Sequence, residues 1–161
     1  MKRDFASLNP QEALWVAVAI EERNAQIYEN FASMFQDYDR ETVEIFKEMA
    51  AEEWEHGKEL ESRYRKCYGE QRLELVPGDI QQPMEAPVVS EGELFIYQGL
   101  SMREALEVGL RAEREARDYY RHLAKRTSDE ELRKLYQELA DTEDDHERRL
   151  GNKLREHAER A

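Results

Sequence analysis

The sequence predicts an all-α fold, a four-helix bundle built from two repeated helical hairpins that are joined by one long crossover. The composition is the first reason, because strong helix formers abound and the 161 residues include only 7 Gly and 4 Pro. The second reason is that four segments carry apolar residues at helical spacing. The third is that two of these segments repeat the other two. A chain of this length is typical of a single domain, and we expect one domain over residues 1–161.

Helix start and stop signals predict helices over residues 10–35, 39–68, 101–126 and 128–159. A residue that caps a helix start accepts a hydrogen bond from the free N–H groups of the first turn. The candidate caps in this sequence are Asn9, Asp39, Ser101 and Ser128, three of which have Glu three residues later, as in a capping box. Gly69 follows the second predicted helix and is suited to end it.

The linker between the second and third predicted helices, residues 69–99, has a different character, with three prolines and no helical period. So long a loop inside one domain is uncommon. We expect it to be a crossover that returns the chain, so that the third helix starts where the second helix started, as in the ferritin-like version of a four-helix bundle. Within it, Glu93–Tyr97 is apolar enough to pack on the bundle or form a short strand. The linker would also let two chains exchange hairpins, so we expect a homodimer.

The two predicted hairpins repeat each other helix by helix, and the third helix aligns with the first without a gap. When Glu113 is aligned with Glu21, Tyr120 falls on Tyr28. The fourth helix matches the second in the same way, and the pairs that coincide are Glu143 with Glu53, His146 with His56 and Leu150 with Leu60. A hairpin doubled in this way predicts a bundle with pseudo-twofold symmetry.

Each of the four predicted helices has an apolar stripe that is interrupted in its middle by glutamate, and on two helices a histidine follows three residues later. Carboxylates in a core are costly unless something pairs with them. Two divalent cations would nearly cancel four carboxylates, and glutamate and neutral histidine are good ligands for iron or manganese. We therefore predict a two-metal centre whose ligands are Glu21, Glu53, His56, Glu113, Glu143 and His146.

The spacing also predicts a role for each ligand. Two Glu-x-x-His motifs that face each other, with one further Glu from each remaining helix, form a carboxylate-bridged pair of metals in helix bundles. We assign Glu53 and Glu143 as bridging ligands and Glu21 and Glu113 as terminal ligands. One Glu-x-x-His alone would more simply be a solvated helix face, and the matched second copy is what favours a metal site.

Two tyrosines, Tyr28 and Tyr120, each follow a terminal glutamate by two helical turns. They are candidate hydrogen-bond donors to the ligand carboxylates, and ordinary core packing is the alternative. The remaining histidines, His122 and His157, are expected to be exposed.

Charge and cysteine content narrow the classes of partner. The net charge of −13 disfavours binding to nucleic acid or to anionic lipid. The longest apolar stretch, Ala13–Ile20, is too short to span a bilayer, so we expect no membrane association. The single cysteine, Cys67, allows no disulfide within the chain and no cysteine-pair metal site, which is consistent with a cytoplasmic location.

Four strings around the predicted ligands resemble the rubrerythrin branch of the ferritin-like superfamily, and the resemblance covers all four helices. The strings are AIEERNA at 19–25, AEEWEH at 51–56, RAEREA at 111–116 and DTEDDH at 141–146. The chain is most similar to the erythrin type, which lacks the rubredoxin domain. The resemblance implies a non-haem centre of two iron ions per chain that reacts with hydrogen peroxide or dioxygen in defence against oxidative stress.

Two departures from the family keep the function open. The cysteine pairs of the rubredoxin iron site are absent, so electrons must come from an external donor protein or from ferrous iron itself. Rubrerythrins also carry a glutamate three residues after the ligand of the third helix, where this chain has Ala116. The remaining symmetrical set resembles the ferroxidase centre of bacterioferritin. The candidate functions are therefore a peroxidase or oxidase, a ferroxidase or iron-handling protein without sustained turnover, a dimanganese catalase-like centre, and a purely structural metal bundle.

Overall fold

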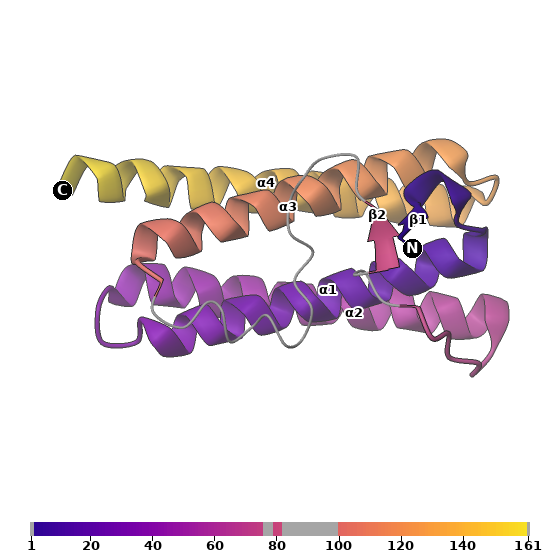
Figure 1. The fold of residues 1–161 in the computed structure, drawn as a ribbon, viewed down its shortest axis with the longest axis horizontal. Coiled ribbons are helices and arrows are strands. Elements are labelled where there is room, and N and C mark those ends of the chain that lie inside the picture. Colours follow the sequence, from indigo (N-terminus) through magenta and orange to yellow (C-terminus); the bar gives the residue numbers. More distant parts are fainter. Residues whose placement is uncertain (1, 76–78, 82–99, 161) are drawn as a thin grey trace. The chain divides into compact units, whose positions relative to one another are not determined.

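A computed structural model describes residues 2–75, 79–81 and 100–160 of the chain. Within these ranges the long helices are α1 (Pro10–Met34), α2 (Arg40–Tyr68), α3 (Met102–Arg126) and α4 (Glu130–Arg160). The short elements are the strands β1 (Arg3–Asp4) and β2 (Ile80–Gln81) and the 3₁₀ helix η1 (Phe5–Ser7). Helices α1 and α2 form one hairpin and α3 and α4 form a second (Figure 1), which confirms the predicted all-α fold of two helical hairpins.

The helices of the first hairpin begin at the predicted caps. Asn9 Oδ1 accepts a hydrogen bond from the Glu12 N–H at 2.9 Å, and Glu12 Oε2 accepts one from the Asn9 N–H at 2.9 Å. This reciprocal pair is a complete capping box. Asp39 accepts hydrogen bonds from the N–H and the hydroxyl of Thr42 at 3.3 and 2.8 Å, so it caps α2. Both predicted helix starts are therefore confirmed.

In the second hairpin one predicted cap is confirmed and one is wrong. Ser101 Oγ accepts a hydrogen bond from the Glu104 N–H at 3.1 Å and caps α3. Ser128, predicted as the cap of the last helix, does not hold that position. The carboxylate of Asp129 accepts hydrogen bonds from two N–H groups of the first turn at 3.0 and 3.1 Å, and α4 begins at Glu130. Asp129 is the better placed acceptor because it directly precedes the first helical residue.

Helix α2 ends at the predicted glycine. Gly69 has a φ of +76°, and its N–H donates to the Arg65 carbonyl at 2.9 Å. A positive φ at this position is the usual way to end a helix, and glycine adopts it without a steric penalty.

A short parallel strand pair was not predicted. Arg3 in β1 lies beside Ile80 in β2, so the N-terminal segment contacts the linker. Two-residue strands carry no readable sequence period, which is why the pattern did not reveal them. The apolar segment Glu93–Tyr97 and most of the linker lie outside the described residues.

The chain divides into two compact units, and the first comprises Met1–Glu29 with Lys47–Gln98. In this unit the Trp15 ring packs against Tyr64 with centroids 5.0 Å apart. The Tyr64 hydroxyl donates to the Gln71 carbonyl at 2.7 Å, and Trp15 Nε1 donates to the Leu75 carbonyl at 3.1 Å. These contacts fix the segment after α2 against α1.

The second unit comprises Asn30–Phe46 with Gly99–Ala161, so it joins the tip of the first hairpin to α3 and α4. Phe31 packs on Phe46 with centroids 5.5 Å apart. Lys153 Nζ near the end of α4 lies 2.7 Å from Glu41 Oε1 at the start of α2. Because α4 runs antiparallel to α3 (Figure 1), this contact also brings the start of α3 to the end where α2 starts. The topology is therefore that of the predicted crossover.

The helices are amphipathic, with charged residues along their exposed sides. The whole sequence has a mean hydropathy of −0.95. Across the described parts of the chain, no helix has an apolar stretch of the length that a bilayer span requires.

Candidate metal centre

Both hairpins bury glutamate in helix faces that are otherwise apolar. The inward stripe of α2 is Phe46, Met49, Glu53, His56 and Leu60, and that of α4 is Leu132, Tyr136, Leu139, Glu143, His146 and Leu150. The four predicted glutamate ligands are all 0% exposed, namely Glu21, Glu53, Glu113 and Glu143. A carboxylate buried to this degree is strongly unfavourable unless a cation or several hydrogen bonds compensate it.

In the first unit, two of these glutamates lie together with a histidine. One ligand atom each from Glu21, Glu53 and His56 lies within 4.8 Å of the others. His56 Nδ1 lies 3.4 Å from Glu21 Oε2, and the His56 side chain is 17% exposed. We call these three residues the first cluster.

The register of α1 against α2 explains this cluster. Glu21 lies opposite His56, and further along α1 Phe31 lies opposite Phe46. Each step forward along α1 is thus matched by a step back along α2, as in an antiparallel pair. Gly57 faces Glu21 across this helix pair, and a Cβ at that position would lie at an ordinary contact distance of 3.5 Å from Glu21 Cβ.

The second unit holds an equivalent group on α3 and α4, which we call the second cluster. One ligand atom each from Glu113, Glu143 and His146 lies within 4.8 Å of the others. His146 Nδ1 lies 3.4 Å from Glu113 Oε2 and 3.3 Å from Glu143 Oε2. All three side chains are fully buried. The internal repeat of the sequence therefore reappears as two clusters of the same three donors.

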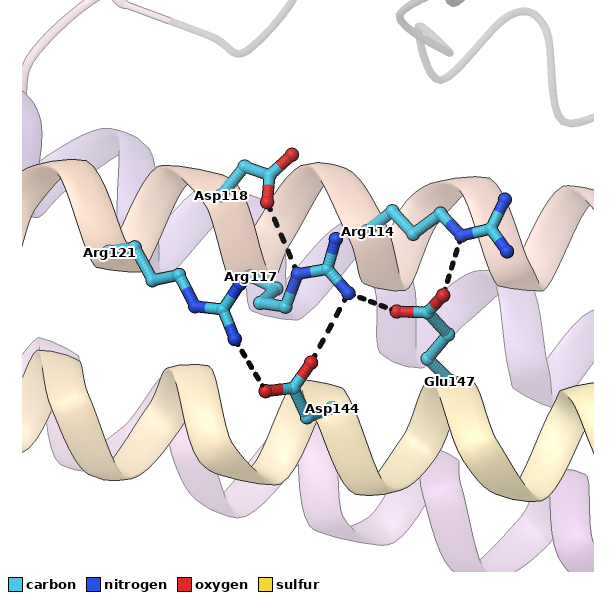
Figure 2. A network of polar contacts seen from close by, with 6 residues as sticks. All are labelled: Arg114, Arg117, Asp118, Arg121, Asp144 and Glu147. Carbon is cyan, nitrogen blue, oxygen red and sulfur yellow. Dashed lines mark hydrogen bonds and ion pairs between the residues drawn. The ribbon is translucent and has the colours of Figure 1, made fainter.

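A polar network on the surface of the second hairpin lies beside the second cluster. Figure 2 shows Arg117 of α3 between Asp118 of its own helix and Asp144 and Glu147 of α4. Arg117 lies 3.1 Å from Asp118 Oδ1 and 3.2 Å from Asp144 Oδ1, and it also pairs with Glu147. The network is completed by Arg114 on Glu147 at 2.6 Å and by Arg121 on Asp144 at 2.7 Å.

This network joins α3 and α4, the two helices that supply the residues of the second cluster. Partial burial lowers the pKa of Arg117, but the hydrogen bonds and charges of Asp118, Glu147 and Asp144 outweigh that effect and raise the pKa above its ordinary value. Asp144 and Glu147 directly follow Glu143 and His146 in the sequence. The ion pairs therefore hold α4 to α3 at the level of the second cluster.

The predicted tyrosines are both in the core. Tyr28 and Tyr120 are 0% exposed, and the Tyr120 ring stacks on Tyr136 with centroids 6.2 Å apart. Burial, with the Coulombic effect of Tyr136, raises the pKa of neighbouring Tyr119 well above its ordinary value, so that phenol stays protonated. A hydrogen bond from Tyr28 or Tyr120 to a ligand carboxylate remains a prediction.

Other residues singled out by the sequence lie away from the clusters or are inert. Cys67 is exposed near the end of α2, and His122 and His157 are partly exposed. Ala116 is buried on α3 and supplies no donor. Asn24 was not predicted, yet its side chain is fully buried on α1. A polar residue three positions after Glu21, within an apolar stripe, was the signal that could have identified it.

The donor sets decide what chemistry the clusters can support. Each offers two carboxylates and one imidazole, a combination of oxygen and nitrogen donors that suits iron or manganese. Carboxylates can also bridge two cations, as in the two-metal sites of helix bundles. The carboxylate and histidine groups therefore fit the metal-binding residues of a di-iron protein.

The fold is shared with solved structures of low sequence identity. A protein from Pyrococcus furiosus matches with a TM-score of 0.71 and 20% identity over 93% of this chain and 90% of its own. A Thermotoga maritima protein described as ferritin-like and diiron-carboxylate matches with a TM-score of 0.72 and 18% identity, over 92% and 96%. A conserved protein from Magnetospirillum magnetotacticum matches with a TM-score of 0.72 and 23% identity, over 92% of this chain and 95% of its own. These matches establish the ferritin-like four-helix fold.

The comparison of the sequence itself is more specific. A search of the curated proteins finds no match to this chain. The family model described as Rubrerythrin matches residues 12–154, a range that includes all six predicted ligands. The match confirms the resemblance carried by the four ligand strings, and the chain belongs to the rubrerythrin family.

Proposed function

We propose that the two clusters together bind a pair of iron ions, and that the protein uses this pair to reduce hydrogen peroxide or dioxygen. The observation that carries the proposal is the presence of equivalent Glu, Glu, His groups in the two hairpins, with all four glutamates and His146 fully buried. Membership of the rubrerythrin family supports the same reading, as does the likeness to a protein described as diiron-carboxylate.

Charge balance supports two divalent cations rather than one. Four buried carboxylates carry four negative charges, which two divalent cations neutralise while two neutral imidazoles complete the donor set. Glu53 and Glu143 share a helix with a histidine ligand, so we assign them as bridging carboxylates. Glu21 and Glu113 then bind as terminal ligands. Two ferrous ions bound in this way would each supply one electron, so the pair would supply two electrons to the oxidant.

An external electron donor is part of this proposal. Cys67 is the only cysteine in the sequence, so the chain has no cysteine pairs for a second iron site. Repeated turnover therefore requires electrons from an external donor, either another protein or ferrous iron itself. We also propose, from the long linker, that the protein forms a homodimer.

Ala116 favours a second candidate function. The family glutamate at this position is replaced by a buried alanine, which leaves a symmetrical set of four glutamates and two histidines. A set without the extra carboxylate suits a ferroxidase that oxidises and passes on iron without sustained turnover. The two candidates differ in kinetics, because only a peroxidase consumes excess peroxide continuously when a reductant is present.

The first experiment tests metal binding. We expect the wild type to bind two ferrous ions per chain and the Glu53→Ala/His56→Ala variant to lose binding at the first cluster. Metal at 100 times its Kd should stabilise the wild type by about 2.7 kcal/mol for each site that it fills. Glu55→Ala is the matched control, because Glu55 lies on the same helix with a side chain that is 72% exposed. Unchanged stoichiometry and melting temperature in the double variant would rule out the assignment of the first cluster.

The second experiment tests the reaction. The iron-loaded protein is mixed with excess peroxide, with and without ascorbate as the reductant. Continuous peroxide consumption only with reductant is the expected result. Oxidation that stops after one turnover in both mixtures would favour the ferroxidase. Continuous consumption without reductant would contradict both candidates and indicate catalase chemistry. Metal analysis of the natively purified protein would then decide whether the centre holds iron or manganese.

A further inference from the structure

Asn24 is a buried carboxamide that has no role in the six-ligand set. Its side chain is 0% exposed, and it lies in the middle of α1, where asparagine is a poor helix former. Among the described residues, neither Asn24 Oδ1 nor Asn24 Nδ2 has a hydrogen-bond partner. Because both ends of the amide lack a partner, exchanging its oxygen and nitrogen would not change this finding. Buried amides are nearly always satisfied, so one without a partner in the protein points to a partner outside the chain, such as an ion or a water.

The position of Asn24 directs it to the first cluster. It follows Glu21 by three residues, and residues at this spacing share one face of a helix. In the antiparallel register that pairs Glu21 with His56 and Phe31 with Phe46, Asn24 comes level with Glu53. Asn24 therefore lies on the helix face and at the level of two residues of the first cluster.

The internal repeat shows that the second cluster has no such group. When Glu113 is aligned with Glu21, the residue that matches Asn24 is Ala116. Ala116 is also buried, but a methyl group offers no donor atom. The two clusters thus agree in their glutamates and histidines and differ in this one oxygen.

We propose that Asn24 Oδ1 is an additional metal ligand of the first cluster, and that it makes the two metal positions chemically unequal. The inference rests on the proposed two-metal function. The amide oxygen is a neutral donor of the kind that hard cations accept, so it adds a ligand without adding charge to an already acidic site. The amide N–H groups are then free to donate to a carboxylate oxygen of the same cluster.

The inequality has a consequence for reactivity. A metal position with an additional protein ligand has less room for a small molecule, whereas catalytic sites keep a coordination position open. A metal held by Glu113, Glu143 and His146 would therefore have more room for the oxidant than one held by Glu21, Glu53, His56 and Asn24.

The test uses Asn24→Leu, which replaces the amide by an apolar side chain of similar branching. If Asn24 is a metal ligand, the variant should raise the melting temperature of the metal-free protein, because a buried amide without partners is removed. In cobalt(II) titrations the same variant should lose about tenfold or more in affinity at one of two sites. The visible absorption of cobalt at that site should become more intense as its coordination number falls.

Two further variants make the result specific. Ala116→Asn should place an equivalent amide in the second cluster, and the two cobalt sites should then become more alike in affinity and spectrum. Asn30→Leu is the control, because Asn30 is exposed on the same helix, and it should leave both cobalt affinities unchanged.

Failure of this inference is distinguishable from failure of the proposed function. If wild-type protein binds fewer than two cobalt ions per chain, the two-metal function is wrong and the ligand role falls with it. If wild type binds two and Asn24→Leu binds both with the same affinities and spectra, Asn24 is not a ligand. A fall in the stability of the metal-free variant, with cobalt binding unchanged, would assign Asn24 a purely structural role.

Discussion

The ion pairs of Arg117 should stabilise the second hairpin more than an ordinary surface pair does. The Arg117 side chain is 19% exposed and meets three carboxylates, two of which come from the neighbouring helix α4. Exposed pairs contribute about 0.2–1 kcal/mol each, and burial of the arginine stem adds packing. We therefore expect Arg117→Ala to lower the free energy of unfolding by about 1–2 kcal/mol. For a domain of this size each kcal/mol lowers Tm by about 2–4 °C.

The matched control is Arg103→Ala on the same helix. Within the part of the chain that the structure describes, Arg103 pairs with Glu107 alone, at 3.1 Å, and its side chain is 68% exposed. A pair of this kind is worth about 0.3–0.5 kcal/mol. Both variants are unfolded with urea in the metal-free state at several salt concentrations. The Debye length falls from about 10 Å at 0.1 M to about 3 Å at 1 M salt, so the difference between the variants should decrease at high salt. An equal loss of stability in the two variants, or a difference unaffected by salt, would show that the Arg117 ion pairs add no more stability than an exposed pair.

Four further substitutions test the local structure by urea unfolding. Gly57→Ala should stabilise the protein by about 0.5–1 kcal/mol, because alanine favours the helix more than glycine does. The added Cβ would lie at an ordinary 3.5 Å from Glu21 Cβ on the neighbouring helix. A loss of stability would show that the two helices are closer than this. Burial raises the pKa of Asp39, but the Thr42 hydrogen bonds and nearby positive charges outweigh it, so the pKa is lowered overall. Asp39→Asn should therefore cost stability above about pH 4, and the difference from wild type should vanish as pH falls through the lowered pKa; a difference independent of pH would contradict the shift. Asp129→Ala should cost about 0.5–2 kcal/mol and Ser128→Ala less than about 0.5 kcal/mol; the reverse order would restore Ser128 as the cap.

The repeated features of the sequence were the ones that could be predicted. Helical spacing reports which face of a helix is buried, so a glutamate within an apolar stripe can be recognised without a structure. Caps act within a single turn, and Asn9, Asp39 and Ser101 were identified for that reason. The crossover followed from the length of the linker, and the ion pair of Lys153 with Glu41 has the position that it requires.

Contacts between distant residues could not be read in the same way. The pairing of β1 with β2 joins residues far apart in the sequence and depends on the path of the linker. The choice of Asp129 over Ser128 depends on a one-residue difference in where α4 begins, and both residue types are good caps. The Arg117 network reads in the sequence as an ordinary charged helix surface. Asn24 was missed because one amide does not alter a helical period.

The proposed function depends on the binding of a pair of metal ions by the first and second clusters. The most direct test is an anaerobic calorimetric titration of the metal-free protein with ferrous iron, with the bound iron counted after gel filtration. We expect saturation at two iron ions per chain and a higher melting temperature at saturation. Saturation at one ion per chain, or no binding, would contradict it.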